Sequence, residues 1–146
     1  MTSIQLTREF DTNSGTGILW QKLTDPVALG HCIPGCESVT VIDDLTSKWV
    51  VKITVGVISR KIDAKARILE KNDELKTMVI RFDSKEGDFV GKFKVRVEEI
   101  MGEKKSSKII LDSEMDARGS FQWIINQVIK SQLDKFSYEF IKCISQ

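Results

Sequence analysis

The chain is poor in the side chains on which most catalytic and metal sites depend. It has one histidine, His31, and only three cysteines, Cys32, Cys36 and Cys143. A structural zinc site needs four protein ligands, which His31 and the cysteines could supply only if adjacent residues bound the same ion. A cysteine nucleophile needs a base within hydrogen-bond reach and a group that orients it, and neighbouring positions in the sequence do not establish either. We therefore expect no metal site, no catalytic residue and no cofactor.

The few cysteines also bear on the compartment. Three is an odd number without the spacing of a disulfide framework, which favours reduced thiols in a cytoplasm. The N-terminal residues MTSIQLTREFDT contain no apolar signal region, and no later run approaches the roughly 20 apolar residues that a membrane span requires. We expect a cytoplasmic protein with at most peripheral membrane association.

An excess of one charge is missing as well. The 22 basic and 21 acidic residues leave a formal net charge of +1, so there is no electrostatic argument for a nucleic-acid partner. The glycines are scattered singly, which excludes a glycine-rich phosphate loop. Paired carboxylates fall at predicted turns or on predicted wet faces, where we expect them to be solvated or paired with Lys94 and Arg96 across strands. A length of 146 residues suits one domain with one core, residues 1–146.

What the sequence does have is a long apolar stripe at its C-terminal end. From Ser120 onward, apolar residues recur at the three- and four-residue steps of one helix face. They are Phe121, Ile124, Ile125, Val128, Ile129, Leu133, Phe136, Phe140, Ile141 and Ile144. We predict a single amphipathic helix of roughly 35 Å, at about 1.5 Å per residue. The natural cover for so long a face is a sheet.

Upstream, the pattern begins with a strand and two short helices. Residues 3–10 alternate as a strand with one mostly apolar face. The polar cluster at residues 11–14 is rich in helix N-cap residues, and apolar residues follow at helical spacing up to Leu23. Asp25 and Pro26 suit the start of a second helix, which should run to about residue 30 or 31. Pro34 and Gly35 end it in a turn.

The pattern then changes to a period of two, and six strands can be separated. They cover residues 37–43, 48–55, 59–70, 75–83, 89–100 and 107–116. The separators, residues 44–47, 56, 72–73, 86–88 and 102–105, are short and turn-rich, which predicts antiparallel hairpins. Charged residues alternate with apolar ones along residues 61–68 and 91–98, so the sheet should have one wet face. We expect a bend or bulge at Gly91.

These elements predict an α+β fold, with a curved seven-stranded antiparallel sheet wrapped around the long C-terminal helix. One local motif also resembles a known family. The residues Leu19-Trp20, Leu23-Thr24-Asp25-Pro26, Leu29 and Cys32-Ile33-Pro34-Gly35-Cys36-Glu37-Ser38 closely resemble the signature of the carbon monoxide dehydrogenase G-subunit family. Residues 51–56 and 62–69 are similar to two of its strands. The family belongs to the helix-grip, or START and Bet v 1-like, superfamily.

The resemblance implies a function. It implies a cavity between sheet and helix that holds a hydrophobic ligand, with the two short helices and the Pro-Gly turn near its mouth. It also implies an accessory role beside a molybdenum-containing dehydrogenase of the carbon monoxide dehydrogenase type, either in recruiting that enzyme to the membrane or in carrying a quinone-like lipid. We expect a non-catalytic carrier whose partners are that ligand and that enzyme.

The apolar residues could form a packed core or line such a cavity. A curved sheet encloses more volume than one helix face fills, and small residues lie on its inward side, so we favour a cavity. The expected lining is Trp20, Trp49, Ala64, Ala66, Met78, Ile80, Phe82, Phe89, Gly91, Phe93, Met115, Phe121, Ile125, Val128 and Ile129. The expected cavity mouth is Asp25, Pro26, Pro34 and Gly35.

Two alternatives to a carrier stay open. The first is a cyclase- or hydrolase-like enzyme on the same scaffold, since one fold can host several functions. Such an enzyme would need a polar residue pair deep in the cavity. The second is a protein-interaction module with a filled cavity, which recruits an oxidoreductase through its surface.

Overall fold

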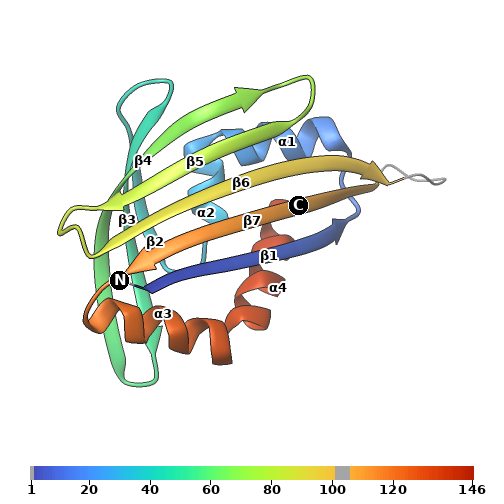
Figure 1. Cartoon of the computed structure of the whole chain (residues 1–146). Coiled ribbons are helices and arrows are strands. Elements are labelled where there is room, and N and C mark those ends of the chain that lie inside the picture. Colours follow the sequence, from blue (N-terminus) through green and yellow to red (C-terminus); the bar gives the residue numbers. More distant parts are fainter. Residues whose placement is uncertain (1, 101–105) are drawn as a thin grey trace.

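The computed structural model describes residues 2–100 and 106–146. One antiparallel sheet runs in the order β1-β7-β6-β5-β4-β3-β2 and curves around the helices (Figure 1). Its strands are β1 (Thr2–Thr12), β2 (Cys36–Val41), β3 (Thr46–Val55), β4 (Ile58–Asn72), β5 (Thr77–Ser84), β6 (Phe89–Ile100) and β7 (Ser106–Ala117). The predicted α+β helix-grip fold is confirmed. The predicted turn at residues 102–105 lies outside the described residues.

Two short helices follow β1, as predicted. They are α1 (Thr16–Thr24) and α2 (Pro26–Cys32). The Asp25 carboxylate caps α2 by accepting hydrogen bonds from the Val27 N–H at 3.0 Å and the Ala28 N–H at 3.5 Å. Gly35 has a φ of +87°, and a Cβ there would collide with the carbonyl oxygen of Lys52. The turn after α2 is therefore seated directly on β3.

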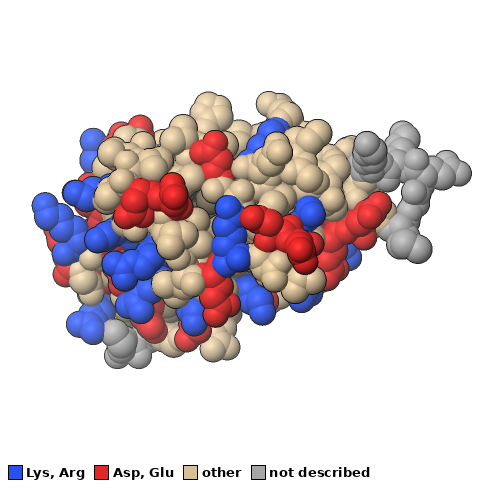
Figure 2. Space-filling view, turned by 90° about the horizontal axis from the view of Figure 1, so that it is seen from above, with Lys and Arg blue, Asp and Glu red and all other residues tan. Residues whose placement is uncertain are grey.

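The alternation along the sheet gives one dry and one wet face. On β4 the charged residues Lys61, Asp63, Lys65 and Arg67 are exposed, whereas the apolar residues between them are buried or half-buried. β6 repeats this arrangement. Seen from above, basic and acidic side chains lie interspersed on the outside of the molecule (Figure 2). The helices cover the opposite, concave face of the sheet, so the core lies between the two layers (Figure 1).

A bend or bulge was expected at Gly91, and no bulge occurs there. Gly91 pairs in regular register with Phe82 on one side and Met115 on the other. The sheet's irregularities lie elsewhere, where the pairing shifts between residues 36 and 38 and between residues 68 and 70. A Cβ on Gly91 would come within 2.7 Å of the Phe93 ring and 2.9 Å of the Phe89 ring. Glycine therefore provides room for its neighbours' rings without a shift in the strand pairing.

Our prediction of a single C-terminal helix is wrong. The segment forms two helices, α3 (Ser120–Ser131) and α4 (Leu133–Ile144), which meet at an angle (Figure 1). Gln132 separates them with a φ of −126° and a ψ of −4°, and its N–H donates to the Val128 carbonyl. No glycine or proline marks the break, and the apolar spacing continues across it. The break coincides with a change of packing partners, from β3 and β7 for α3 to α1 and α2 for α4.

Our expectation that the three cysteines are reduced thiols is also wrong. Cys32 at the end of α2 forms a disulfide with Cys143 in α4, and the two Cα atoms lie 5.3 Å apart. Cys36 is the free cysteine. The pairing was not evident from spacing because the two residues are 111 positions apart and meet only when α4 packs on α2. Among the residues described, no helix combines the length and the apolar character that crossing a bilayer would demand.

Candidate ligand-binding cavity

A cavity of about 280 Å³ lies between the concave face of the sheet and the helices. Every strand except β2 contributes to its wall, as do all four helices and the turn after α2. The lining consists of Phe10, Leu23, Leu29, Ile33, Trp49, Val51, Ile53, Ile62, Ala64, Met78, Ile80, Phe82, Phe89, Phe93, Val95, Ile109, Leu111, Phe121, Ile125, Phe136 and Phe140. The volume is close to the lower end of what small-molecule pockets commonly have.

The wall is almost entirely hydrocarbon. Among the described lining residues, Trp49 carries the one side-chain N–H, and that group already donates to the Ser47 hydroxyl at 2.8 Å. The sulfur of Met78 is only a weak acceptor. A polar ligand group inside the cavity would lose its hydrogen bonds to water without replacement, which costs free energy. The cavity therefore favours an apolar occupant.

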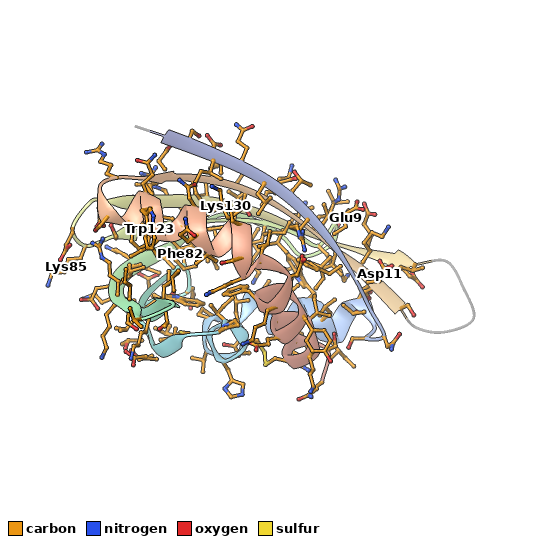
Figure 3. The ribbon with its side chains drawn as sticks, turned by 90° about the horizontal axis from the view of Figure 1, so that it is seen from below. Glu9, Asp11, Phe82, Lys85, Trp123 and Lys130 are labelled. Atoms are coloured by element: carbon orange, nitrogen blue, oxygen red, sulfur yellow. A yellow bond between two sulfur atoms is a disulfide. The ribbon has the colours of Figure 1, made fainter. Side chains whose placement is uncertain are left out.

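Aromatic rings form much of one wall. Phe82 meets Trp49 edge to face with ring centroids 5.2 Å apart, and it meets Phe93 in the same way at 5.6 Å. At the other end, Phe89 and Phe121 are 5.2 Å apart. In the view from below, α3 lies in front of Phe82 (Figure 3). These contacts connect β3, β5, β6 and α3, so the wall around the cavity is held by ring packing.

One charged side chain, which is not itself among the lining residues, packs against the cavity wall. The guanidinium of Arg60 on β4 lies over the ring of Phe121, 5.0 Å from its centroid. Arg60 also pairs with Asp88, with Glu86 at 3.2 Å and with the Ser120 hydroxyl at 3.2 Å. The cluster joins β4, the β5–β6 turn and the first residue of α3. The cluster therefore links the sheet to the start of α3 at this end of the molecule.

Asp88 is the acidic centre of that cluster. Its side chain is 21% exposed. Burial acts to raise the pKa of its carboxyl, but hydrogen bonds from Ser84 and Arg60 and the charge of Arg60 outweigh burial, so the pKa lies below its ordinary value. The Ser84 hydroxyl donates to Asp88 at 2.7 Å and accepts from the Phe89 N–H at 3.0 Å. Asp88 is therefore ionised at neutral pH and balances the charge of Arg60.

A second inward-facing arginine lies on β1. Arg8 occupies the same face as Phe10, and its guanidinium pairs with Asp134 of α4 at 3.1 Å. Asp134 is 97% exposed, so this ion pair is solvated and contributes little to stability. Arg8 thus resembles Arg60 in orientation but differs in burial and in its neighbours.

The structure brings many of the predicted lining residues together around the cavity. These are Trp49, Ala64, Met78, Ile80, Phe82, Phe89, Phe93, Phe121 and Ile125. They come from four strands and from α3, and they were selected as large apolar or small residues on inward-facing positions. Their role in ligand binding stays a prediction.

The other predicted lining residues lie outside the wall. Trp20 is buried in the core, and its indole N–H donates to Asp73 at 2.9 Å. Ala66 is 1% exposed and packs within the core beyond the cavity. Gly91 and Met115 pair across β6 and β7, where the rings of Phe89 and Phe93 fill the space above Gly91. Val128 and Ile129 are half-buried on α3 without reaching the cavity.

Sequence reasoning missed a further part of the lining. The missed residues are Phe10, Leu23, Leu29, Ile33, Val51, Ile53, Ile62, Val95, Ile109, Leu111, Phe136 and Phe140. Most of the strand residues among them could have been found by extending the alternation, since Val51 and Ile53 share a face with Trp49, and Ile62 shares one with Ala64. Phe136 and Phe140 lie on the apolar stripe of the C-terminal segment, but that stripe does not show which of its residues face the cavity.

The predicted mouth residues lie beside the cavity in the segment that contains α2. Asp25 and Pro26 begin that helix, and Pro34 and Gly35 form the turn behind it. The segment reaches the cavity through Leu29 and Ile33. Among the described residues, no group of three or more histidine, cysteine or acidic side chains is placed to hold a metal ion.

Similarity to known proteins agrees with this geometry. The sequence profile of the CoxG family, the G-subunit of carbon monoxide dehydrogenase, matches residues 9–146. The chain belongs to this family. The match covers the signature residues around Pro26 and Pro34, and it extends through the cavity-lining strands to the last helix. No curated protein sequence matches the chain significantly.

Solved structures similar to this member of the CoxG family share its fold. A conserved protein from Geobacillus kaustophilus is 18% identical, has a TM-score of 0.76, and covers 97% of this chain and 95% of its own. The Zhui aromatase/cyclase from Streptomyces sp. R1128 is 8% identical, with a TM-score of 0.68 and coverages of 99% and 92%. Norcoclaurine synthase from Thalictrum flavum is 14% identical, with a TM-score of 0.63 and coverages of 98% and 87%. At these identities the likeness establishes the fold alone.

Proposed function

We propose that this protein is a non-catalytic carrier that binds a hydrophobic small molecule or lipid of the quinone type. The observation that supports the proposal is the continuous apolar wall of the cavity, whose one indole N–H is already paired with Ser47. Binding would be driven by removing apolar ligand surface from water, at roughly 25 cal/mol per Å². Specificity would then follow from the shape of the cavity.

The proposed partner is a molybdenum-containing dehydrogenase of the carbon monoxide dehydrogenase type. This part of the proposal rests on membership of the CoxG family. A carrier of this kind would exchange an electron-accepting lipid between that enzyme and a membrane, which requires no more than peripheral membrane association.

An enzyme on the same scaffold is the alternative, because an aromatase/cyclase and norcoclaurine synthase have related folds. General acid–base or nucleophilic catalysis needs a titratable or nucleophilic side chain at the reacting atoms. None of the described residues that line the cavity carries one. This favours the carrier over the enzyme.

The test is to identify what the protein holds. The protein is purified under native conditions and extracted with organic solvent, and the extract is analysed by mass spectrometry. A quinone or isoprenoid in stoichiometric amount would support the carrier. An empty extract, together with no binding of added quinones or fatty acids, would contradict it and favour an interaction module.

A further inference from the structure

The hydrocarbon wall raises the question of where a ligand's polar group lies. A quinone or a similar amphiphile carries oxygen atoms that accept hydrogen bonds, and burying them unpaired is unfavourable. The lining offers them no unpaired donor among the described residues, since the Trp49 indole N–H is bound to Ser47. The polar group must therefore lie at the border of the cavity, against a side chain outside the hydrocarbon wall.

The β3–β4 hairpin indicates which side chain that is. Directly paired residues of two antiparallel strands point to the same face. The pairs Trp49–Ala64 and Val51–Ile62 line the cavity with both members. In the next inward pair, Ile53 lines the cavity but its partner is Arg60. A charged residue thus takes the place in the inward row where an apolar one would continue the wall.

Arg60 is held close to the cavity by its neighbours. Its side chain is only 24% exposed, and its guanidinium lies over the ring of Phe121, which is 1% exposed and part of the cavity wall. Arg60 is not itself among the lining residues, but its guanidinium is in contact with a ring that is. Arg8 is also an inward-facing arginine, but its partner Asp134 is solvated, and within the described residues Arg8 makes no cation–π contact with a lining ring.

The hydrogen bonds of Arg60 leave it able to donate further. A guanidinium has five N–H donors. Nη2 donates to Asp88 and Glu86, and Nη1 donates to Ser120, so the Nε–H and one Nη1–H are not used by these contacts. The two carboxylates more than balance its single positive charge. The remaining donors therefore suit a neutral acceptor, whereas an anionic group would be repelled by Asp88 and Glu86.

We propose that Arg60 is the binding site for the polar end of the ligand, where it donates hydrogen bonds to a neutral carbonyl or hydroxyl oxygen of an amphiphile whose hydrocarbon part fills the cavity. The inference rests on the proposed function, because it assigns the orientation of the proposed ligand. It also selects a ligand class, in which neutral quinones, ketones and alcohols bind in preference to fatty acids and phospholipids.

Three probes with one tail and different heads test the proposal. They are decylbenzoquinone, decylbenzene and 4-decylbenzoic acid, and their dissociation constants are measured by titration calorimetry for the wild-type protein and for Arg60→Met. Arg60→Met keeps the length of the side chain but removes its donors. We expect it to weaken binding of the quinone by about fivefold to tenfold, the effect of one lost hydrogen bond. Binding of decylbenzene should not change.

The matched control is Arg8→Met, which removes the other inward-facing arginine. We expect it to leave the ratio between quinone and decylbenzene affinity at its wild-type value. Arg60→Lys keeps the charge beside Asp88 with fewer donors, so it should give an intermediate loss for the quinone. This variant also provides the measurement if Arg60→Met does not fold.

The outcomes separate this inference from the proposed function. Failure of all three probes to bind the wild-type protein would contradict the carrier itself. If Arg60→Met weakens the binding of decylbenzene and of the quinone by the same factor, the proposed role of Arg60 would be overturned but the carrier function would not. The arginine would then only support the cavity wall. Tighter wild-type binding of the carboxylate than of the quinone would overturn the preference for a neutral head.

Discussion

The indole ring of Trp49 meets the phenyl ring of Phe82 edge to face, with centroids 5.2 Å apart and an angle of 88° between the rings. Both side chains line the cavity, and the indole N–H is fixed by Ser47. A ligand in the cavity would therefore contact a tryptophan whose position is defined by two neighbours. Trp123, by contrast, projects from α3 and is 48% exposed.

We predict that decylbenzoquinone quenches the fluorescence of Trp49 when it binds. Trp49→Phe should abolish most of the saturable quenching, because Trp49 is the tryptophan, among the described residues, that lines the cavity holding the bound quinone. Trp123→Phe is the matched control. It should keep the saturable quenching but lose the quenching that increases linearly with the concentration of free quinone. Equal saturable quenching in both variants would place the bound quinone outside the cavity.

A second prediction uses two alanines on the same face of β4 to distinguish the cavity from the packed core. Ala64 lines the cavity, whereas Ala66 is packed in the core. Ala64→Leu should reduce ligand affinity at least tenfold with little loss of stability, since the added atoms enter empty space. Ala66→Leu should lower the free energy of unfolding by about 1–3 kcal/mol through overpacking. Urea unfolding and probe titration check both, and a stability loss of equal size in the two variants would argue against an empty cavity.

The disulfide gives a third prediction. Cys32–Cys143 closes a long loop, so its loss should lower the free energy of unfolding by about 2–5 kcal/mol. The double variant Cys32→Ser, Cys143→Ser should match the wild-type protein in reducing agent when unfolding is followed in urea. Cys36→Ser is the control and should keep the wild-type sensitivity to reducing agent. A wild-type midpoint that does not respond to reducing agent would contradict the pairing.

The Asp88 cluster gives a pH prediction. The pKa of Asp88 is lower in the folded protein than in the unfolded chain, where an aspartate titrates near 3.9. Its stabilising contribution is therefore present above about pH 4 and is lost as the pH falls through the folded value. Asp88→Asn should cost roughly 1–3 kcal/mol at pH 7, where Arg60 loses a charged partner. The difference from wild type should shrink towards pH 2, and a difference independent of pH would rule out this role.

The fifth prediction concerns ligand release. We expect the segment of residues 25–35, which contains α2 and the Pro34–Gly35 turn, to act as a hinge that opens the cavity. Its amides should exchange with deuterium faster than those of β5 and β6, and faster still after reduction frees Cys32 from α4. If these amides exchange as slowly as those of the central strands under both conditions, this segment does not act as a hinge.

Much of the fold could be predicted because its signals are local. The strand pattern needs only neighbouring residues, and the cap at Asp25 needs only the next three, so these elements were found close to their observed bounds. The break at Gln132 has no such signal. The apolar spacing is the same on both sides of it, and the two helices differ in what they pack against, since α3 contacts β3 and β7 whereas α4 contacts α1 and α2.

The site was harder to predict than the fold. Alternation shows which way a side chain points, but whether it meets empty space depends on elements distant in the sequence, such as Phe10 on β1 and Phe140 on α4. For this reason Ala64 and Ala66, two residues apart on the same face, lie on different sides of the cavity's boundary. The pairing of Cys32 with Cys143 depends on the same long-range packing.

The disulfide also determines which parts of the chain can extend under an applied force. It closes a covalent ring from the end of α2 through most of α4, so that 31 residues precede Cys32 and only three follow Cys143. A force applied to the two ends can stretch only these outer segments, to roughly 110–120 Å at about 3.3–3.6 Å per residue. The reduced chain could extend to roughly 500 Å at the same length per residue. Six of the seven strands are therefore shielded from tension, and under load β1 is the strand that peels from the sheet.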